Sequence, residues 1–442
     1  MRIAYCTDTY APEINGVANT LSKLGAYLDG KQIHQLIIAP DYDGDYPDMD
    51  SEYRKIYRFN GIISPLAPKS RLAFPAFWET DEIMDSFEPD IIHVTTEFGI
   101  GSRGVRYAAT RNIPLVTSFH TNFCQYLKYH NIDVFRPFLE NYFLWFHSFS
   151  ARTLVPSRHT LGELSSKGYR NLDIWSRGID TSHFNPEYKN NELRKTLSSS
   201  SDKFIFLYVG RLSAEKSLDL LIQAAAEVER LHPGKATFVF TGDGPYTKII
   251  NNSIKSGSLP NIVLTGFKSG KELSEIYASA DCFVFPSGTE TFGNVVLEAM
   301  ASRLPVVGVG SGGVTDFLSH NQNSLLCAPE DTQGFSNNLI TIMEDENLCK
   351  RLGKSAYETA LSRNWNTIFD GLVETYADVI KKDSRKTSRR KIKNYSSRKT
   401  EPKVRGRSKF TKGIKRVLSG KFAFFAFWGN VLIGCFSSVF KK

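Results

Sequence analysis

Two glutamates of this chain, Glu290 and Glu298, stand eight residues apart on either side of a run suited to anion binding. The apolar segment 281–290 ends in turn-forming residues and predicts a strand, whereas 295–303 has helical composition. The residues between them fall at a helix N-terminus, where unpaired backbone N–H groups and the helix dipole attract phosphate. The residues predicted at this N-terminus are Phe292, Gly293, Asn294 and Val295.

The two carboxylates bracket the predicted phosphate site. A carboxylate accepts hydrogen bonds from neighbouring hydroxyls, so one glutamate can hold a ribose and the other a hexose on opposite sides of a diphosphate. An ordinary strand-to-helix turn with two solvated glutamates has the same spacing, and the motif alone leaves both interpretations open.

A pair of cations follows a second predicted strand. Segment 204–209 is apolar and leads into Gly210 and Arg211, and Lys216 stands just before an amphipathic helix. Arg as a bidentate donor and Lys as a point charge can converge on one oxygen-rich leaving group. Isolated cations at a helix start are commonly only solvated. These two, however, follow the carboxyl end of a strand, where open α/β sheets bind ligands.

Several motifs occur together in a fixed order. Those of the second half are G-R-L-x-x-E-K at 210–216, G-D-G-P at 242–245, the two glutamates, and S-G-G at 311–313. In the first half, DTYAPEINGVANT at 8–20 contains Gly16, which allows close approach of the backbone to a ligand, and SFHTNFCQYLKYH at 118–130 contains His120. In this order the motifs resemble those of the retaining GT-B glycosyltransferases of family 4.

Three segments resemble one branch of that family. They are DIIHVTTEFGIG at 90–101, the HTNF loop at 120–123 and WSRGIDTSHFNP at 175–186. They look most like the branch that holds sulfoquinovosyl- and mannosyl-transferases acting on diacylglycerol lipids. The resemblance covers roughly residues 1–380.

The resemblance implies hexose transfer from a nucleotide sugar with retention of configuration, and it implies no cofactor. Arg211, Lys216 and the helix N-terminus would stabilise the charge that grows on the diphosphate. Glu290 would bind the sugar hydroxyls and Glu298 the ribose, and His120 or the backbone near it would contact the sugar. A lone histidine at a strand end is often only a core residue, so this last role rests on the resemblance. The other residues expected to bind the donor are Gly16, Gly210, Gly266, Phe267, Phe292, Gly293, Asn294 and Val295, with the base at 266–268.

Alternating strand-like and helical segments predict an α/β protein. The expected architecture is the GT-B fold, two Rossmann-like doubly wound domains facing across a cleft that holds the donor. The domains are expected at 1–170 and 171–380, and the second set of strands begins with DIWSRG at 173–178. The helix 365–382 is expected to end the fold, and by resemblance the chain near it crosses back to the first domain.

Two other ligand sites are disfavoured by the sequence. The acidic run 41–52 has acids at positions 1, 3, 5 and 12, as a calcium loop would, but Tyr46 stands where the sharp turn needs Gly. The loop after the first strand offers only Gly16 in place of G-x-G-x-x-G, which disfavours a nicotinamide-dependent dehydrogenase. No D-x-D-like pair stands in a matching position, so no metal site is predicted.

The basic character of the chain belongs to its last residues. The net charge is +9, but residues 381–442 alone carry 20 Lys and Arg against Asp383 and Glu401, which leaves the remaining chain at −9. An acidic body disfavours a nucleic-acid enzyme, whose site should itself be basic. Segment 381–418 is predicted to be a basic, disordered linker. The six cysteines form no C-x-x-C pair, which favours reduced thiols in a cytosolic body.

The segment 419–442 is predicted to associate with a membrane. Its run 422–440 has 19 uncharged residues, a length of roughly 28 Å as a helix, so it can either span the hydrocarbon core or lie in the interface. A helix packed on the body is the remaining interpretation. The basic linker would bind anionic lipid, which places the enzyme at the cytoplasmic face of the cell membrane. Nucleic acid is disfavoured as its partner because Tyr395 and Phe410 are its only aromatic residues.

The predicted acceptor is a membrane lipid such as diacylglycerol or a glycosyl-diacylglycerol. The apolar segment 64–78 carries Lys69 and Arg71, which suit a lipid's stem and anionic head, although a plain hydrophobic loop would look similar. The alternative is a glycosyltransferase of cell-surface polysaccharide or lipid-linked oligosaccharide synthesis. The donor sugar can be UDP- or GDP-linked.

Overall fold

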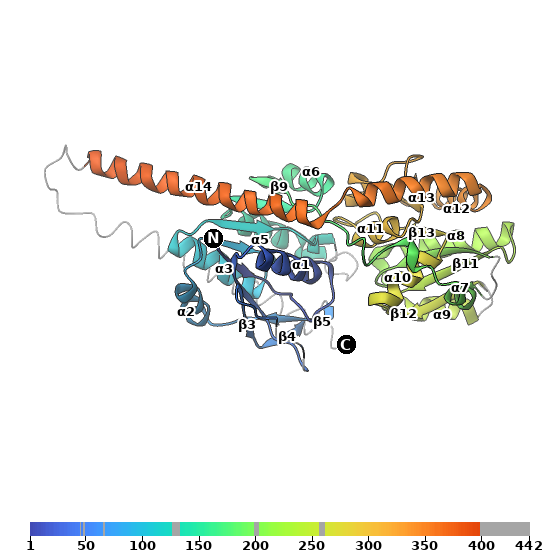
Figure 1. Cartoon of the computed structure of the whole chain (residues 1–442), viewed down its shortest axis with the longest axis horizontal. Coiled ribbons are helices and arrows are strands. Elements are labelled where there is room, and N and C mark those ends of the chain that lie inside the picture. Colours follow the sequence, from blue (N-terminus) through green and yellow to red (C-terminus); the bar gives the residue numbers. More distant parts are fainter. Residues whose placement is uncertain are drawn as a thin grey trace.

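The computed structural model describes residues 1–44, 46, 49–64, 67–125, 133–198, 203–255 and 261–397. Two parallel β-sheets follow one another along the long axis of the molecule, each with helices over its faces (Figure 1). This confirms the predicted pair of Rossmann-like α/β units.

The first sheet has seven parallel strands in the order β3-β2-β1-β6-β7-β8-β9. Its strands are β1 (Arg2–Cys6), β2 (His34–Pro40), β3 (Arg54–Phe59), β6 (Ile91–Val94), β7 (Leu115–Ser118), β8 (Arg152–Val155) and β9 (Leu172–Ile174). An antiparallel hairpin joins β4 (Gly61–Ser64) to β5 (Ala67–Ala73). The helices of this half are α1 (Gly16–Gly30), α2 (Phe77–Phe87), α3 (Gly99–Arg111), the 3₁₀ turn η1 (Asp133–Phe135), α5 (Arg136–His147) and α6 (Arg158–Ser166).

The strand β9 corrects one expectation. The sequence assigned DIWSRG to the second set of strands, but β9 pairs with β8 at the edge of the first sheet. Two of its three residues are exposed, so its composition carries no apolar signal for either sheet.

The second sheet has six strands in the order β12-β11-β10-β13-β14-β15. Its strands are β10 (Phe204–Val209), β11 (Ala236–Thr241), β12 (Ile262–Gly266), β13 (Cys282–Phe285), β14 (Val306–Val309) and β15 (Ser324–Cys327). The 3₁₀ turns of this half are η2 (Pro186–Tyr188), η3 (Ala214–Lys216) and η4 (Gly312–Asp316). Its helices are α7 (Asn191–Ser198), α8 (Leu218–Leu231), α9 (Thr247–Lys255), α10 (Gly270–Ser279), α11 (Asn294–Ala301), α12 (Thr332–Glu344) and α13 (Glu346–Leu361).

The core of the second unit lies on both faces of its sheet. Every residue of β11 and all but the first of β10 are buried, as expected for parallel strands that helices cover on both sides. Phe206 stacks on Phe238 with the ring centroids 4.9 Å apart, and Phe283 lies in the cluster on the other face. Burying each of these rings stabilises the fold by about 2–3 kcal/mol. The polar loops that follow the strands are thereby held at one edge.

The helix α14 (Trp365–Ser397) crosses back and packs on the first sheet, as the resemblance implies (Figure 1). Phe369 and Tyr376 are buried in the same apolar cluster as Tyr5 of β1. The Tyr376 hydroxyl also lies 2.6 Å from Nδ1 of His93 on β6. The helix continues past residue 382, where the sequence places its end, so residues 383–397 of the predicted linker are helical.

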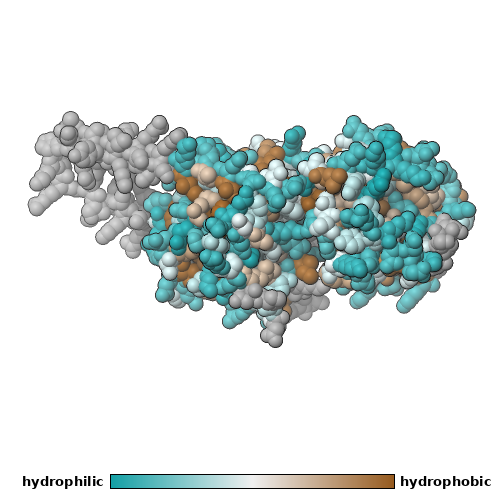
Figure 2. Space-filling model, in the orientation of Figure 1, coloured by the Kyte–Doolittle hydropathy of each residue, from teal (hydrophilic) through white to brown (hydrophobic). Residues whose placement is uncertain are grey.

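Most of the described surface in the view of Figure 2 is hydrophilic, and apolar residues form separate patches. Trp78 at the start of α2 is the most prominent exposed aromatic residue, with 74% of its surface accessible. No helix among the described residues is long and apolar enough to cross a membrane. The run 422–440, for which the sequence predicts membrane association, lies outside the described residues.

Candidate functional site

The N-termini of two helices, one from each α/β unit, meet where the two units join. Gly16 begins α1, and Asn294 begins α11. A Cβ atom on Gly16 would lie 3.0 Å from Nδ2 of Asn294, so the two helix ends are in contact. Asn15 caps α1 by accepting hydrogen bonds from the N–H groups of Val17 and Ala18 at 3.0 and 2.9 Å. Two positive helix ends at one place favour an anion beside them.

The S-G-G motif packs against the backbone of the loop that leads into α11. A Cβ atom on Gly313 would lie 2.0 Å from the carbonyl oxygen of Thr291, and the Gly313 N–H donates to the Glu290 carbonyl at 2.7 Å. Gly293, directly before the helix, has φ of 95°, a conformation that favours glycine. These glycines fix where Glu290 stands. Phe292 turns its side chain into the core against Phe317, so only its backbone faces the site.

Lys216 and Glu290 form an ion pair, which joins two of the sequence motifs at one point. Lys216 ends η3, and Glu290 precedes α11; both side chains are largely but not fully buried. Arg211 lies exposed at the end of β10, and within the described part of the chain its guanidinium has no ion-pair partner. The arrangement places a cation and a carboxylate beside a helix N-terminus, which suits a phosphate with hydroxyls next to it.

Glycines bring the loops after three strands into backbone contact. Gly242 has φ of 142°, and a Cβ atom on it would lie 1.9 Å from the Gly210 carbonyl oxygen. Its N–H donates to the Gly266 carbonyl at 2.9 Å. Gly244 approaches the loop after β10 in the same way, because a Cβ atom on it would lie 2.2 Å from the Leu212 carbonyl oxygen. The loops that carry Arg211 and the predicted base-binding residues are therefore packed together.

The predicted base-binding loop follows β12. Gly266 has φ of 71° and ends the strand, and Phe267 exposes 54% of its surface. Lys268 pairs with Glu272 one helical turn further on. An exposed ring next to the phosphate-side loops can stack on a planar base.

Glu298 accepts a 2.9 Å hydrogen bond from the hydroxyl of Tyr277, which is fully buried on α10. Tyr277 also donates, at 3.3 Å, toward the carbonyl of Val295. Burial raises the pKa of Glu298 to about 7, against the opposing effects of the Tyr277 hydrogen bond and the charge of Lys23 on α1. The charge of Glu298 can therefore change near neutral pH.

Both the ring and the backbone carbonyl of His120 form hydrogen bonds with residues from distant segments. Its Nδ1 atom lies 2.7 Å from Nη2 of Arg177, and its carbonyl accepts a 2.8 Å hydrogen bond from the hydroxyl of Thr291. Nε2 of His120 is buried, and no residue in the described part of the chain forms a hydrogen bond with it. Burial, followed by the charge of Arg177, lowers the pKa of His120 well below 6.5. The contact with Thr291 places His120 against the loop that carries Glu290.

Of the two predicted acceptor-side residues, only the side chain of Arg71 is described, and its ion pair does not join it to the residues above. Arg71 on β5 forms an ion pair with Asp43, and the Lys69 side chain lies outside the described part of the chain. Their role stays a prediction.

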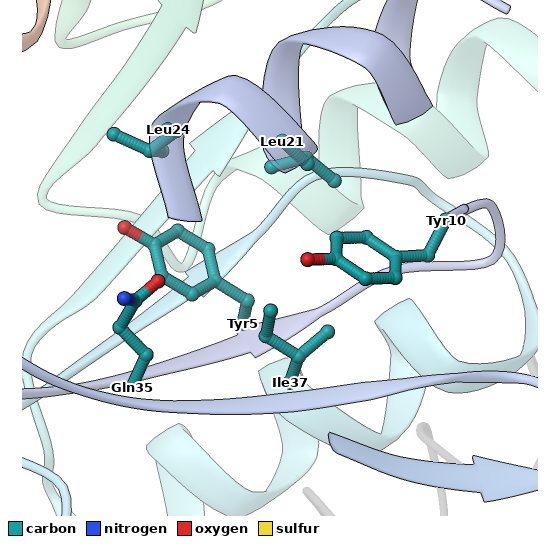
Figure 3. A pocket seen from close by; sticks show the side chains of 6 residues that line it. All are labelled: Tyr5, Tyr10, Leu21, Leu24, Gln35 and Ile37. Carbon is teal, nitrogen blue, oxygen red and sulfur yellow. The ribbon is translucent and has the colours of Figure 1, made fainter. Parts of the chain in front are cut away.

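A small pocket in the first unit lies apart from these residues (Figure 3). Leu21 and Leu24 of α1 lie over Tyr5 of β1 and over Ile37 and Gln35 of β2. Tyr10 closes one side, and neither its hydroxyl nor Oε1 of Gln35 has a hydrogen-bond partner among the residues that the structure describes. The pocket is part of the packing between α1 and the sheet.

Three residues of the site were not singled out by sequence reasoning. Thr291 lies inside the spacer between the two glutamates, and Arg177 lies inside the WSRGID segment, where each is one polar residue among several. Tyr277 reads as one more apolar position of a helix. The contact each one makes is with a distant segment, so only the fold reveals it.

Known protein families match both halves of the chain. Residues 14–183 match the family model described as Glycosyltransferase Family 4, and residues 189–359 match Glycosyl transferases group 1. A GDP-mannose-dependent alpha-mannosyltransferase of Corynebacterium glutamicum is 28% identical over 385 residues, which cover 86% of this chain and 89% of that protein. An alpha-monoglucosyldiacylglycerol synthase of Streptococcus pneumoniae is 27% identical over 395 residues, 83% and 87% of the two chains. A sulfoquinovosyl transferase of Arabidopsis thaliana is 33% identical over 286 residues, 63% of this chain and 54% of that one.

Solved structures share the architecture. A sucrose-phosphate synthase from Thermosynechococcus elongatus superposes with a TM-score of 0.71 at 19% identity, over 86% of this chain and 99% of that one. Anabaena HepE in complex with UDP gives a TM-score of 0.67 at 20% identity, over 86% and 100% of the two chains. At this identity the likeness establishes the fold.

Proposed function

Because the chain belongs to the family 4 glycosyltransferases with the GT-B fold, we propose that it moves a hexose from a UDP- or GDP-linked sugar to a membrane lipid, with retention of configuration. The acceptor class is diacylglycerol or a glycosyl-diacylglycerol. The observation that carries the proposal is the Lys216–Glu290 ion pair beside the N-terminus of α11, where groups suited to phosphate and to hydroxyls stand together.

The diphosphate is proposed to lie at the meeting helix ends, beside Gly16 and Asn294. As the glycosidic bond lengthens, negative charge grows on the diphosphate and positive charge on the anomeric carbon. Lys216, Arg211 and the N–H groups at the start of α11 stabilise the negative charge without needing to move. Removing one such preorganised group typically costs about 3–4 kcal/mol of transition-state stabilisation.

The remaining donor groups are assigned by their position around the phosphate site. Glu290 accepts hydrogen bonds from the hexose hydroxyls, and Glu298, eight residues on and held by Tyr277, accepts them from the ribose. Phe267 stacks on the base. In this assignment each glutamate serves a different hydroxyl-rich part of the donor. No metal or cofactor is assigned, because these cations and helix ends carry the phosphate charge.

The proposal of a lipid acceptor is supported by the name of one relative. The pneumococcal protein is a diacylglycerol glucosyltransferase by name, and most of its length is matched by this chain. Lys69 and Arg71 are proposed to meet the lipid on the acceptor side. Transfer to a polysaccharide or lipid-linked oligosaccharide is the competing outcome of the test below.

Attachment to anionic membranes is proposed for the residues beyond 381. Each Lys or Arg close to an anionic bilayer contributes about 1 kcal/mol of attraction. A chain ending at Ile380, which keeps the packed residues of α14 and lacks all 20 Lys and Arg residues of 381–442, should therefore lose binding to phosphatidylglycerol vesicles in flotation at low salt, while the full chain floats with them. Neutral vesicles are the control. Flotation of the shortened chain would assign membrane binding to the folded body instead.

The function is tested with purified full-length protein in vesicles that hold diacylglycerol or a monoglycosyl lipid. A panel of UDP- and GDP-sugars is offered with EDTA present, and lipids are read by mass spectrometry. The proposal expects one lipid to gain a single hexose. Lys216→Met should abolish most of this product, whereas Lys271→Met, which removes an exposed partner of Glu275, should not. Donor hydrolysis without a lipid product would favour the oligosaccharide alternative.

A further inference from the structure

Arg177 is a buried cation without a carboxylate partner. Only 5% of its surface is exposed, and among the described residues it forms no ion pair. Its guanidinium donates to the carbonyl oxygens of Trp175 at 2.6 Å and Ser176 at 3.1 Å, and it lies over the Trp175 ring. Burying an uncompensated charge is unfavourable, and such departures concentrate at functional sites. Burial lowers the pKa of Arg177 to about 9, so it still carries its charge at neutral pH.

The remaining hydrogen bond of Arg177 determines the state of His120. A guanidinium has only N–H donors, so Nδ1 of His120 must accept the 2.7 Å hydrogen bond from Nη2. A proton on Nδ1 would place two donors face to face, and an imidazolium would in addition place a second positive charge beside the first. The ring is therefore neutral, with its proton on Nε2.

The other titratable groups around His120 act in the same direction as Arg177. His93 on β6 and His147 at the end of α5 both disfavour a charge on the His120 ring. Oε1 of Glu97 lies 3.5 Å from Nε2 of His147. Within the described ranges, no carboxylate forms an ion pair with His120 or with Arg177.

The Nε2–H group that results is a donor in need of an acceptor. Nε2 of His120 is buried and has no hydrogen-bond partner among the described residues, although the His120 carbonyl is fixed by Thr291 next to Glu290. A buried donor left unpaired is unfavourable, which points to a ligand group as its partner. We propose that Arg177 is a positioning residue that keeps His120 neutral and Nε2-protonated, so that this N–H donates to a hydroxyl of the transferred hexose.

The neutral form suits the proposed reaction, on which this inference rests. Positive charge develops on the anomeric carbon as the donor bond breaks, and an imidazolium beside it would oppose that charge. A neutral N–H can still orient the sugar. Arg177 thereby adds to the effect of burial in keeping His120 unprotonated.

The state of His120 is measured by ¹⁵N NMR of the full-length protein with labelled histidines, and the signal lost in His120→Asn identifies the residue. The wild-type ring should show the Nε2–H tautomer and no titration between pH 5 and 8. In Arg177→Met the ring should show mixed tautomers, and its titration should move to higher pH than in the wild type, because only the effect of burial and of the other two histidines remains. Arg177→Lys, which still donates to Nδ1, should keep the wild-type signal. An Nδ1–H tautomer in the wild type would overturn the inference without involving any activity.

The kinetic arm is the pH profile of hexose transfer in the vesicle assay. Arg177→Met should lower kcat/KM by about tenfold to a hundredfold, the loss expected for one charge-assisted hydrogen bond, and its rate should begin to fall at a higher pH on the acidic side than that of the wild type. Arg363→Met is the matched control, since Arg363 is a half-buried arginine that bonds Ser176 at 3.0 Å and does not contact His120. An Arg177→Met enzyme with the wild-type profile and tautomer would refute the role. The predicted NMR signals without any transfer would instead refute the proposed function.

Discussion

The Tyr277 hydroxyl donates a 2.9 Å hydrogen bond to Oε2 of Glu298. This bond joins a fully buried side chain of α10 to the carboxylate proposed to hold the ribose. Because the Tyr277 side chain is buried in the core of the second unit, it can hold the carboxylate in one orientation. The same surroundings raise the pKa of Glu298 to about 7 by burial.

Nucleotide binding should therefore depend on pH near neutrality. Ribose hydroxyls donate to the carboxylate form, so binding favours loss of the proton from Glu298. A group with a pKa of about 7 is roughly 90% protonated at pH 6, so affinity for UDP or GDP should fall about tenfold between pH 8 and pH 6. Isothermal titration calorimetry measures this directly.

Two variants separate Glu298 from other titrating groups. Glu298→Gln should bind nucleotide more weakly at pH 8 and show a flat profile. Tyr277→Phe should move the midpoint of the profile to higher pH, because the lost hydrogen bond stabilises the charged form. Tyr246→Phe removes a similar tyrosine bond to Asp219 and should leave the midpoint unchanged. A tenfold pH effect that persists in Glu298→Gln would assign it to another group.

Arg211→Ala should slow transfer without weakening the fold. The side chain is exposed at the end of β10, whereas the transition state is expected to place growing phosphate charge beside it. Loss of this donor should lower kcat about 10²–10³-fold in the vesicle assay, with the thermal unfolding midpoint unchanged. Arg230→Ala, which removes an exposed arginine paired with Glu227, serves as the control. Unchanged transfer by Arg211→Ala would remove Arg211 from the phosphate site.

Gly242→Ala should destabilise the second unit. The residue has φ of 142°, and the added Cβ atom would lie 1.9 Å from the Gly210 carbonyl oxygen, which backbone movement alone can relieve. We expect a loss of about 2–4 kcal/mol in the free energy of unfolding, measured by urea denaturation. Gly162→Ala on α6, where a Cβ atom meets nothing within 4 Å, should instead add about 0.5–1 kcal/mol. Equal stability of the two variants would contradict the close packing of the loops.

Tyr376→Phe should loosen the attachment of α14 to the first sheet. The change leaves Nδ1 of His93 and the hydroxyl of Tyr5 without their buried partner. The expected cost is about 1–3 kcal/mol in the free energy of unfolding. Tyr27→Phe removes an exposed bond to Asp370 on the same helix and should change stability by less than about 0.5 kcal/mol. A larger loss in Tyr27→Phe than in Tyr376→Phe would show that the surface contact holds the helix.

The sequence predicts the elements that have a strong local signal. The apolar runs of β10 and β11 and the turn residues after them are enough to place Arg211 and the G-D-G-P loop at one sheet edge. The strand β9 was assigned to the wrong sheet because pairing with β8 is a contact between distant segments, and its exposed residues carry no apolar pattern. Arg177 was missed for a related reason. Arginine is usually exposed, and nothing near it in the sequence indicates that this one is buried against His120.

The crossing of α14 also sets the order in which the protein can fold during synthesis. Strands β1 to β9 leave the ribosome first, but the apolar face formed around Tyr5, Leu24 and Trp175 is completed by Phe369, Leu372 and Tyr376. Those residues are translated only after the entire second sheet. The second unit can therefore close its core while the nascent first unit still exposes one face, and that face must be kept from aggregating until the last helix arrives.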